Sequence, residues 1–189
     1  MRARPLEITD LLWSFDPSGG RRGVDRSVAE ADLRDRGQRR AARLVRRMPA
    51  TGSRLDPVAV DALGLRVHYE LARLGEELQL GRRVAALVGS LLAEIGHDCG
   101  QPVRVVDIGC GLGHVLRSIA MRGDLPRSVE LVGVDLNPVL VMEAERLARA
   151  EGLPVRFVNG DAFTPGVAID DGARTVVVST GLLHHLTSD

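Results

Sequence analysis

The second half of the chain alternates short apolar runs with amphipathic segments, a pattern that predicts an α/β fold. Apolar, β-branched runs predict strands at 103–108, 129–134, 155–159 and 174–179. Apolar residues at helical spacing predict helices at 112–121 and 138–150 between them. Asn137 is expected to cap the second of these helices and Gly152 to end it. Such alternation predicts a parallel sheet with right-handed crossovers, whose ligands bind at the carboxyl ends of the strands.

The first half has helical patterns instead. Ser27 and Glu30 match a capping box, which predicts a helix running to about Met48. Asp56 followed by Pro57 predicts the start of a second helix.

Two glycines are expected to bound the helices that follow. Gly81 is expected to end the second helix, and Gly96 a third. We therefore expect a flexible N-terminus at 1–26, a helical segment at 27–100 that could cover the site as a lid, and a Rossmann-like domain at 101–189.

Composition narrows the class of protein. The 189 residues carry 25 basic and 25 acidic side chains, and every basic one is arginine. Two cysteines cannot build a disulfide framework, no apolar run of membrane-spanning length occurs, and the charged N-terminus does not resemble a signal peptide. These features predict a cytoplasmic protein. Seven arginines within 34–47 could bind phosphates, but the stretch has no aromatic residue for base stacking, so we expect a solvated helix face and no nucleic-acid partner.

The most informative motif is the turn after the first strand. Residues 105–113 read Val-Val-Asp-Ile-Gly-Cys-Gly-Leu-Gly and lead into a helix, which favours a ligand lying against bare backbone. His114 stands where a dinucleotide motif would place its last glycine. The Asp107 carboxylate would repel a pyrophosphate but attract an ammonium or sulfonium group. Asp135, after the second strand, is placed to accept hydrogen bonds from ribose hydroxyls.

From Pro102 onward the chain resembles the class I S-adenosylmethionine-dependent methyltransferases. Four segments in order carry the resemblance: 105–113, Val-Gly-Val-Asp-Leu-Asn-Pro at 132–138, Val-Asn-Gly-Asp-Ala-Phe at 158–163, and Val-Val-Val-Ser-Thr-Gly-Leu-Leu-His-His-Leu at 176–186. The resemblance implies S-adenosylmethionine as cofactor, S-adenosylhomocysteine as product, and transfer of a methyl group to an O, N or C atom of a small molecule.

The resemblance also implies a cofactor site. Its methionine part would be held by Asp107, Gly109, Gly111 and Gly113, with Cys110 as a small space-filling residue in the turn. Asp135 would bind the ribose, and Leu136 would pack on the adenine. The adenine edge would meet Asp161, Ala162 and Phe163. Ser179, Thr180 and Gly181 would line the sulfonium and the acceptor side.

Several of these residues have simpler interpretations. Asp161 could cap a turn, and Ser179 and Thr180 could be ordinary strand-end residues. His184 or His185 could act as a base or could pack at a helix start, and neither belongs to a metal-ligand pattern. On the helical segment, His68 and Tyr69 could reach the site or could be packing residues.

The resemblance covers only the first four strands of a seven-stranded family fold. The apolar strand at 174–179 would form an edge, so we expect a truncated longer protein, or a homodimer or other partner that covers the edge. Two alternatives to an active methyltransferase stay open: a catalytically inactive, methyltransferase-like binding or partner subunit, and an NAD(P)-dependent oxidoreductase.

Overall fold

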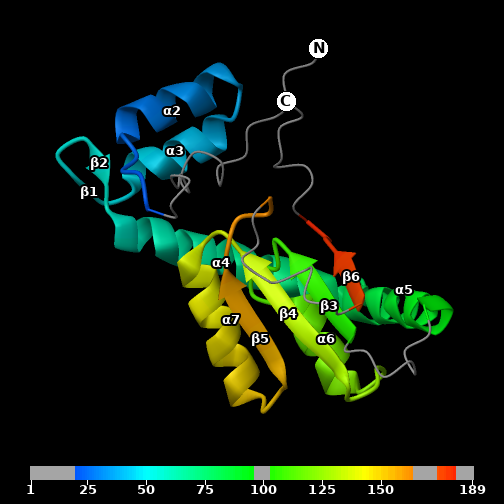
Figure 1. The fold of residues 1–189 in the computed structure, drawn as a ribbon. Coiled ribbons are helices and arrows are strands. Elements are labelled where there is room, and N and C mark those ends of the chain that lie inside the picture. Colours follow the sequence, from blue (N-terminus) through cyan, green and yellow to red (C-terminus); the bar gives the residue numbers. More distant parts are fainter. Residues whose placement is uncertain (1–19, 96–102, 164–173, 182–189) are drawn as a thin grey trace. The chain divides into compact units, whose positions relative to one another are not determined.

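The computed structural model describes residues 20–95, 103–163 and 174–181, and these form two compact units that divide after Val67 (Figure 1). The predicted flexible N-terminus lies mostly outside the described residues, and so does Gly96. The division falls inside helix α4 (Pro57–Glu77), so the last part of α4 and all of α5 (Leu80–Ile95) belong to the same unit as the sheet.

The first unit holds helices α2 (Arg26–Asp35) and α3 (Arg39–Arg47), a hairpin of β1 (Ala50–Thr51) and β2 (Arg54–Leu55), and the start of α4. The single helix predicted from Ser27 to Met48 is therefore wrong. The chain leaves α2 through Gly37, whose φ of +76° suits glycine, and the Gln38 N–H bonds back to the Leu33 carbonyl in a helix-ending motif.

The predicted capping box is also wrong, because a better cap lies two residues earlier. The Asp25 carboxylate accepts hydrogen bonds from the backbone N–H groups of Ser27 and Val28, at 2.9 and 3.1 Å. Glu30 pairs with Arg34, one turn further along the exposed side of the helix. Beneath these helices, a small apolar core includes Leu33, Val45 and Val60.

The second unit contains a four-stranded parallel sheet in the order β5-β4-β3-β6 (Figure 1). The strands are β3 (Val103–Ile108), β4 (Val129–Asp135), β5 (Val155–Asn159) and β6 (Arg174–Val178), each within one residue of its predicted bounds. Helices α6 (His114–Arg122) and α7 (Pro138–Ala150) connect β3 to β4 and β4 to β5. The predicted Rossmann-like parallel sheet is confirmed.

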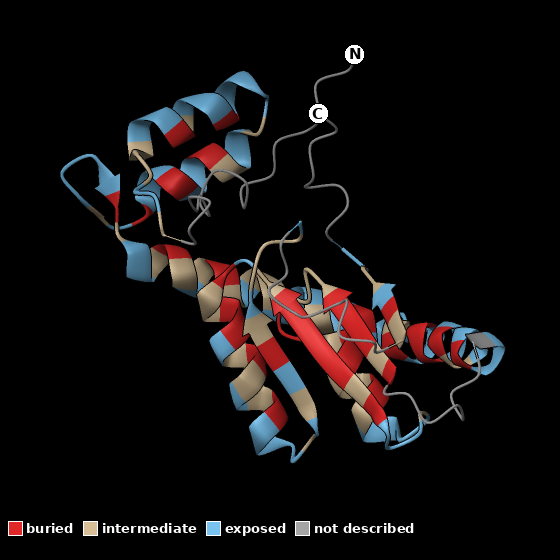
Figure 2. Ribbon diagram, viewed as in Figure 1, coloured by how far each residue is buried: buried red, intermediate tan, exposed pale blue. Residues whose placement is uncertain are grey.

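Helices α5, α6 and α7 share one apolar core with one face of the sheet (Figure 2). Alternation along each strand sends Val105, Leu131 and Phe157 to this face. The other face holds a second cluster, with Val106, Val132 and Val134 at its centre.

Gly81 does not end a helix, as predicted, but lies in the first turn of α5. A Cβ built on Gly81 would lie 2.3 Å from the Ser118 hydroxyl, so the glycine gives α6 room to approach α5. The break falls instead at Gln79, which has a φ of +53°.

Candidate functional site

The strand order reverses between β3 and β6, whose carboxyl ends lie side by side. After β3 the chain proceeds through β4 to β5 on one side, and β6 then adds to the other side of β3. Ligands of open α/β sheets bind where the strand order reverses in this way. The turn at 109–113 follows β3 and Ser179 follows β6, so topology alone brings these two predicted segments together.

The turn after β3 has the backbone shape that its glycines allow. Gly109, Gly111 and Gly113 all have positive φ, at 71°, 54° and 67°. The N–H groups of Gly109 and Cys110 bond to the Val134 carbonyl of β4, at 2.8 and 3.1 Å. These bonds fix the turn against the sheet and place Gly113 at the start of α6.

A phenylalanine fills the inner side of the turn. A Cβ on Gly113 would lie 2.2 Å from the Phe157 ring, and one on Gly133 would lie 2.5 Å from it. Gly133 and Phe157 were not among the predicted site residues. The signal for Gly133 was a glycine inside an otherwise apolar strand, which marks close approach by a neighbour.

Asp107 lies at the end of β3 with only 1% of its surface exposed. Within the part of the chain that the structure describes, its Oδ1 atom has no hydrogen-bond partner. Burial, reinforced by the nearby Asp135 carboxylate, raises the pKa of Asp107 to about 7. A buried carboxyl group without a donor is costly, and a cationic or hydrogen-bonding ligand would relieve that cost.

The Ser179 hydroxyl is a second buried oxygen that has no partner among the described residues. It follows Val178, which pairs with Asp107 in the register of β3 and β6. Two oxygens that lack partners among the described residues therefore lie at the ends of neighbouring strands. Thr180 and Gly181 beside Ser179 are exposed.

Asp135 holds the turn and the start of α7 together. Its Oδ2 accepts from the Gly111 N–H and its Oδ1 from the Asn137 N–H, both at 2.9 Å. Burial raises the pKa of Asp135, although these two donors act in the opposite direction. A carboxylate offers about four acceptor positions, so each oxygen retains one for a further donor.

The segments after β4 and β5 also lie together. The Asn159 amide donates to the backbone carbonyls of Asp135 and Leu136, both at 2.9 Å. Leu136 and Phe163 are exposed, at 39% and 74%, and Ala162 is half-buried. The Asp161 carboxylate accepts from the Phe163 N–H at 2.7 Å, which is the turn-capping role weighed above and leaves its second oxygen for other donors.

The remaining candidate site residues are three histidines, a tyrosine and a cysteine. His68, on α4, lies beside the turn, since a Cβ on Gly111 would be 2.9 Å from its ring. Tyr69 instead hydrogen-bonds to Glu143 on α7. Burial and the two nearby aspartates raise the pKa of the Cys110 thiol, which suits a neutral packing role. His184 and His185 lie outside the described residues.

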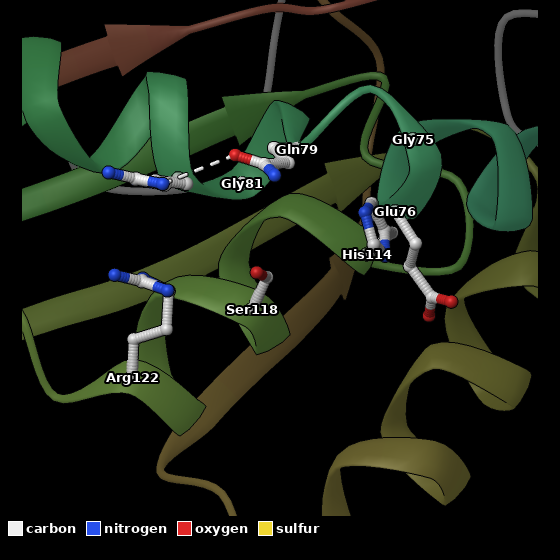
Figure 3. Close-up of a pocket in the computed structure, with 8 residues that line it drawn as sticks. Gly75, Glu76, Gln79, Gly81, His114, Ser118 and Arg122 are labelled. Carbon is white, nitrogen blue, oxygen red and sulfur yellow. Dashed lines mark hydrogen bonds between the residues drawn. The ribbon is translucent and has the colours of Figure 1, made fainter.

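A separate cavity of about 320 Å³ lies beside α6, on the side of α4 and α5 (Figure 3). It is lined by Gly75, Glu76, Gln79, Gly81, Arg82, His114, Ser118 and Arg122, none of which belongs to the predicted cofactor set. Arg122 pairs with Asp124, and Arg82 bonds to Gln79. Across the described ranges, no three His, Cys, Asp or Glu side chains gather as metal ligands, and no helix is long and apolar enough to cross a membrane.

Comparison with known proteins finds a family match over the part of the chain that holds the glycine turn and most of the parallel sheet. Residues 105–189 match the family described as "Methyltransferase domain". This part, a little under half of the chain, is similar to the methyltransferase domains of that family. The match begins within β3 and includes the turn, Asp135 and Ser179.

Two relatives are methyltransferases whose names give different substrates. Ribosomal RNA small subunit methyltransferase A of Myxococcus xanthus (strain DK1622) is 39% identical over 44% of this chain and 27% of its own length. Ajmaline N-methyltransferase of Rauvolfia serpentina is 33% identical over 64% of this chain and 42% of its own. The chain thus spans less than half the length of the curated relatives it matches.

Solved structures give weaker likenesses. Magnesium protoporphyrin IX methyltransferase from Synechocystis PCC 6803, with bound S-adenosylhomocysteine, aligns with a TM-score of 0.38 and 21% identity, over 85% of this chain and 60% of that one. A methyltransferase from Geobacter sulfurreducens in complex with S-adenosylhomocysteine aligns with a TM-score of 0.32 and 26% identity, over 49% and 34%. The similarity to the methyltransferase family therefore rests on the sequence match over residues 105–189.

Proposed function

We propose that this chain binds S-adenosylmethionine at the carboxyl ends of β3 and β6 and takes part in methyl transfer to a small molecule. The observation that carries the proposal is the pair of buried oxygens, of Asp107 and Ser179, that lack partners among the described residues and lie at the carboxyl ends of neighbouring strands. A bound cofactor would supply an electrophilic methyl group on a sulfonium sulfur. The residues of the chain would hold and orient the two reactants.

Asp107 fits the amino group of the methionine part. Its carboxyl is buried, and an ammonium would lower its pKa and replace the missing donor. Gly109 and Gly111 allow a ligand to approach the backbone of the turn, because neither presents a side chain there. Ser179 fits the same end of the ligand from the neighbouring strand.

Asp135 fits the ribose. The Gly111 and Asn137 donors fix the orientation of its carboxylate, so the two remaining acceptor positions are held in place before a ligand binds. Leu136 and Phe163 offer exposed apolar surface for the adenine, with Asp161 and Ala162 at its edge. No group on the chain need act as a nucleophile, because alignment of the acceptor with the methyl group accounts for much of the catalysis in such a transfer.

The proposal also covers the methyl acceptor, a partner subunit along β6 and the cellular compartment. Relatives include ajmaline N-methyltransferase and ribosomal RNA methyltransferases. The arginine-rich 34–47 stretch has no aromatic residue on which an RNA base could stack, which favours a small-molecule acceptor over RNA. A second subunit along β6, one of the two edge strands of the described sheet, and a cytoplasmic location are also part of this proposal.

Equilibrium dialysis with labelled S-adenosylmethionine tests the binding claim, with NAD in parallel. We expect saturable binding of the first ligand only. Asp135→Asn should weaken binding about 10- to 100-fold, since one charge-assisted hydrogen bond is worth about 1.5–3 kcal/mol. Asp124→Asn, at an exposed carboxylate two residues beyond the C-terminal end of α6, is the matched control and should leave binding unchanged.

Unchanged affinity in Asp135→Asn would refute the ribose assignment, and tight NAD binding would favour the oxidoreductase. Binding without transfer to any acceptor would favour the second candidate, a methyltransferase-like binding subunit. That candidate is kept because the chain covers less than half of its relatives.

A further inference from the structure

Helix α5 has an exposed side that carries apolar residues. Its inner stripe, Val84, Ala85, Val88 and Leu92, is buried in the sheet core. On the outer side Leu87 is 66% exposed and Leu91 is 46% exposed. Leu87 and Leu91 are one turn apart, so they form a continuous apolar strip.

The outer side of α5 is complementary to itself in the antiparallel direction. If a second α5 lies antiparallel across the first, with a two-fold axis between residues 88 and 89, Leu87 faces Ser90 of the partner subunit. In the same register, Leu91 faces the partner's Ala86. Each large side chain thus meets a small one, which lets two helices approach closely.

The charges follow the same symmetry. Arg83 and Glu94 lie at opposite ends of the strip and would face each other across the axis, twice in each dimer. Neither side chain forms an ion pair within the described part of the chain, so each charge is available to a partner.

The polar residue at the centre of the strip is compatible with an interface. The Ser90 hydroxyl donates to the Ala86 carbonyl of the previous turn at 3.0 Å. Covering Ser90 therefore leaves no hydroxyl donor unsatisfied.

We propose that this outer side of α5 is a dimer interface, and that its occupant is the α5 of a second copy of this chain in an antiparallel, isologous arrangement. One helix pair covers less surface than a standard interface, so the dimer should be concentration-dependent in the micromolar range. The proposal does not depend on the function proposed above.

Sedimentation equilibrium of the full chain, from about 5 to about 500 micromolar, measures the association. The wild type should pass from monomer to dimer across this range. Leu87→Glu should weaken dimerisation at least tenfold, since it places a carboxylate in the apolar strip. Leu74→Glu, on an exposed leucine of α4, is the matched control and should dimerise like the wild type.

A charge exchange tests the register. Arg83→Glu or Glu94→Arg alone creates two like-charge pairs and should weaken the dimer, whereas the double variant restores both pairs and should recover it. Three results would overturn the proposal: a wild type that stays monomeric throughout, a dimer that Leu87→Glu leaves intact, or a double variant no better than the single ones. Circular dichroism of each variant separates lost association from lost folding.

Discussion

Replacing Asp107 by asparagine should stabilise the free protein and weaken its cofactor binding at the same time. The carboxyl is 1% exposed, and its pKa is raised from 3.8 to about 7 by burial and by the neighbouring Asp135. Raising the pKa of Asp107 by about 3 means that ionising this group in the folded state costs about 4 kcal/mol more than in the unfolded state.

The pH dependence follows from the direction of this shift. Because the folded-state pKa lies above the unfolded-state value, the folded protein holds the proton more tightly, and the cost is absent below about pH 4. The cost grows as the pH rises from about 4 to about 7, and it stays constant above that. The free energy of unfolding of the wild type should therefore fall across this interval.

Asp107→Asn removes the charge but leaves a buried amide, which itself costs about 1–3 kcal/mol if unpaired. At pH 8 the variant should gain about 1–3 kcal/mol in the free energy of unfolding, and at pH 4 it should gain nothing. Its affinity for S-adenosylhomocysteine should fall about 10- to 100-fold, since the ammonium loses a charged partner.

Urea denaturation followed by circular dichroism at pH 4 and pH 8 measures the first effect, and ligand titration at pH 8 measures the second. Asp124→Asn, on an exposed ion pair, is the control and should change stability by less than about 1 kcal/mol at either pH. A variant that is destabilised at pH 8, or one whose gain is equal at both pH values, would show that Asp107 does not carry the buried charge that the reasoning requires.

Further predictions concern the scaffold of the site. Gly113→Ala should lower the free energy of unfolding by at least about 2 kcal/mol, because its Cβ would overlap the Phe157 ring; Gly152→Ala, at a similar φ of +65° with open space around it, should cost only about 1 kcal/mol. Equal costs would refute the packing argument. Asn137→Ala should cost about 1 kcal/mol by removing the cap that accepts from the Val139 N–H at 3.0 Å. The Asn137 backbone donor to Asp135 remains in that variant, so ligand affinity should be unchanged, and a large loss would count against this division of roles.

The sheet could be predicted from sequence because local and tertiary signals agree there. The four strands are short and rich in apolar residues, and Asn137 is the N-cap of α7, as its place before Pro138 predicts. Asp107 and Asp135 lie at the carboxyl ends of β3 and β4, and the glycine turn follows β3. Parallel pairing aligns these strand ends, so the position of all three at one edge of the sheet also followed from the pattern.

The wrong predictions concern helix ends and caps, where the sequence allowed more than one local structure and tertiary contacts determined which one formed. Gly81 looked like a helix end, but it is a helical residue that gives Ser118 room. Asp25 took the capping role from Ser27, and Gly37 interrupted an otherwise continuous helical pattern. Phe157 could not be placed beneath the glycine turn from sequence, because its contact with Gly113 depends on how β5 lies beside β4.

The most direct test of the central claim is calorimetric titration of the chain with S-adenosylhomocysteine near pH 7, in buffers of different ionisation enthalpy, with NAD as control. If the ligand's ammonium meets the Asp107 carboxyl, binding should lower the pKa of that group and release a fraction of a proton. We predict saturable binding with proton release in the wild type, and weaker binding without that release in Asp107→Asn. Binding without proton release in the wild type, or binding of NAD alone, would contradict it.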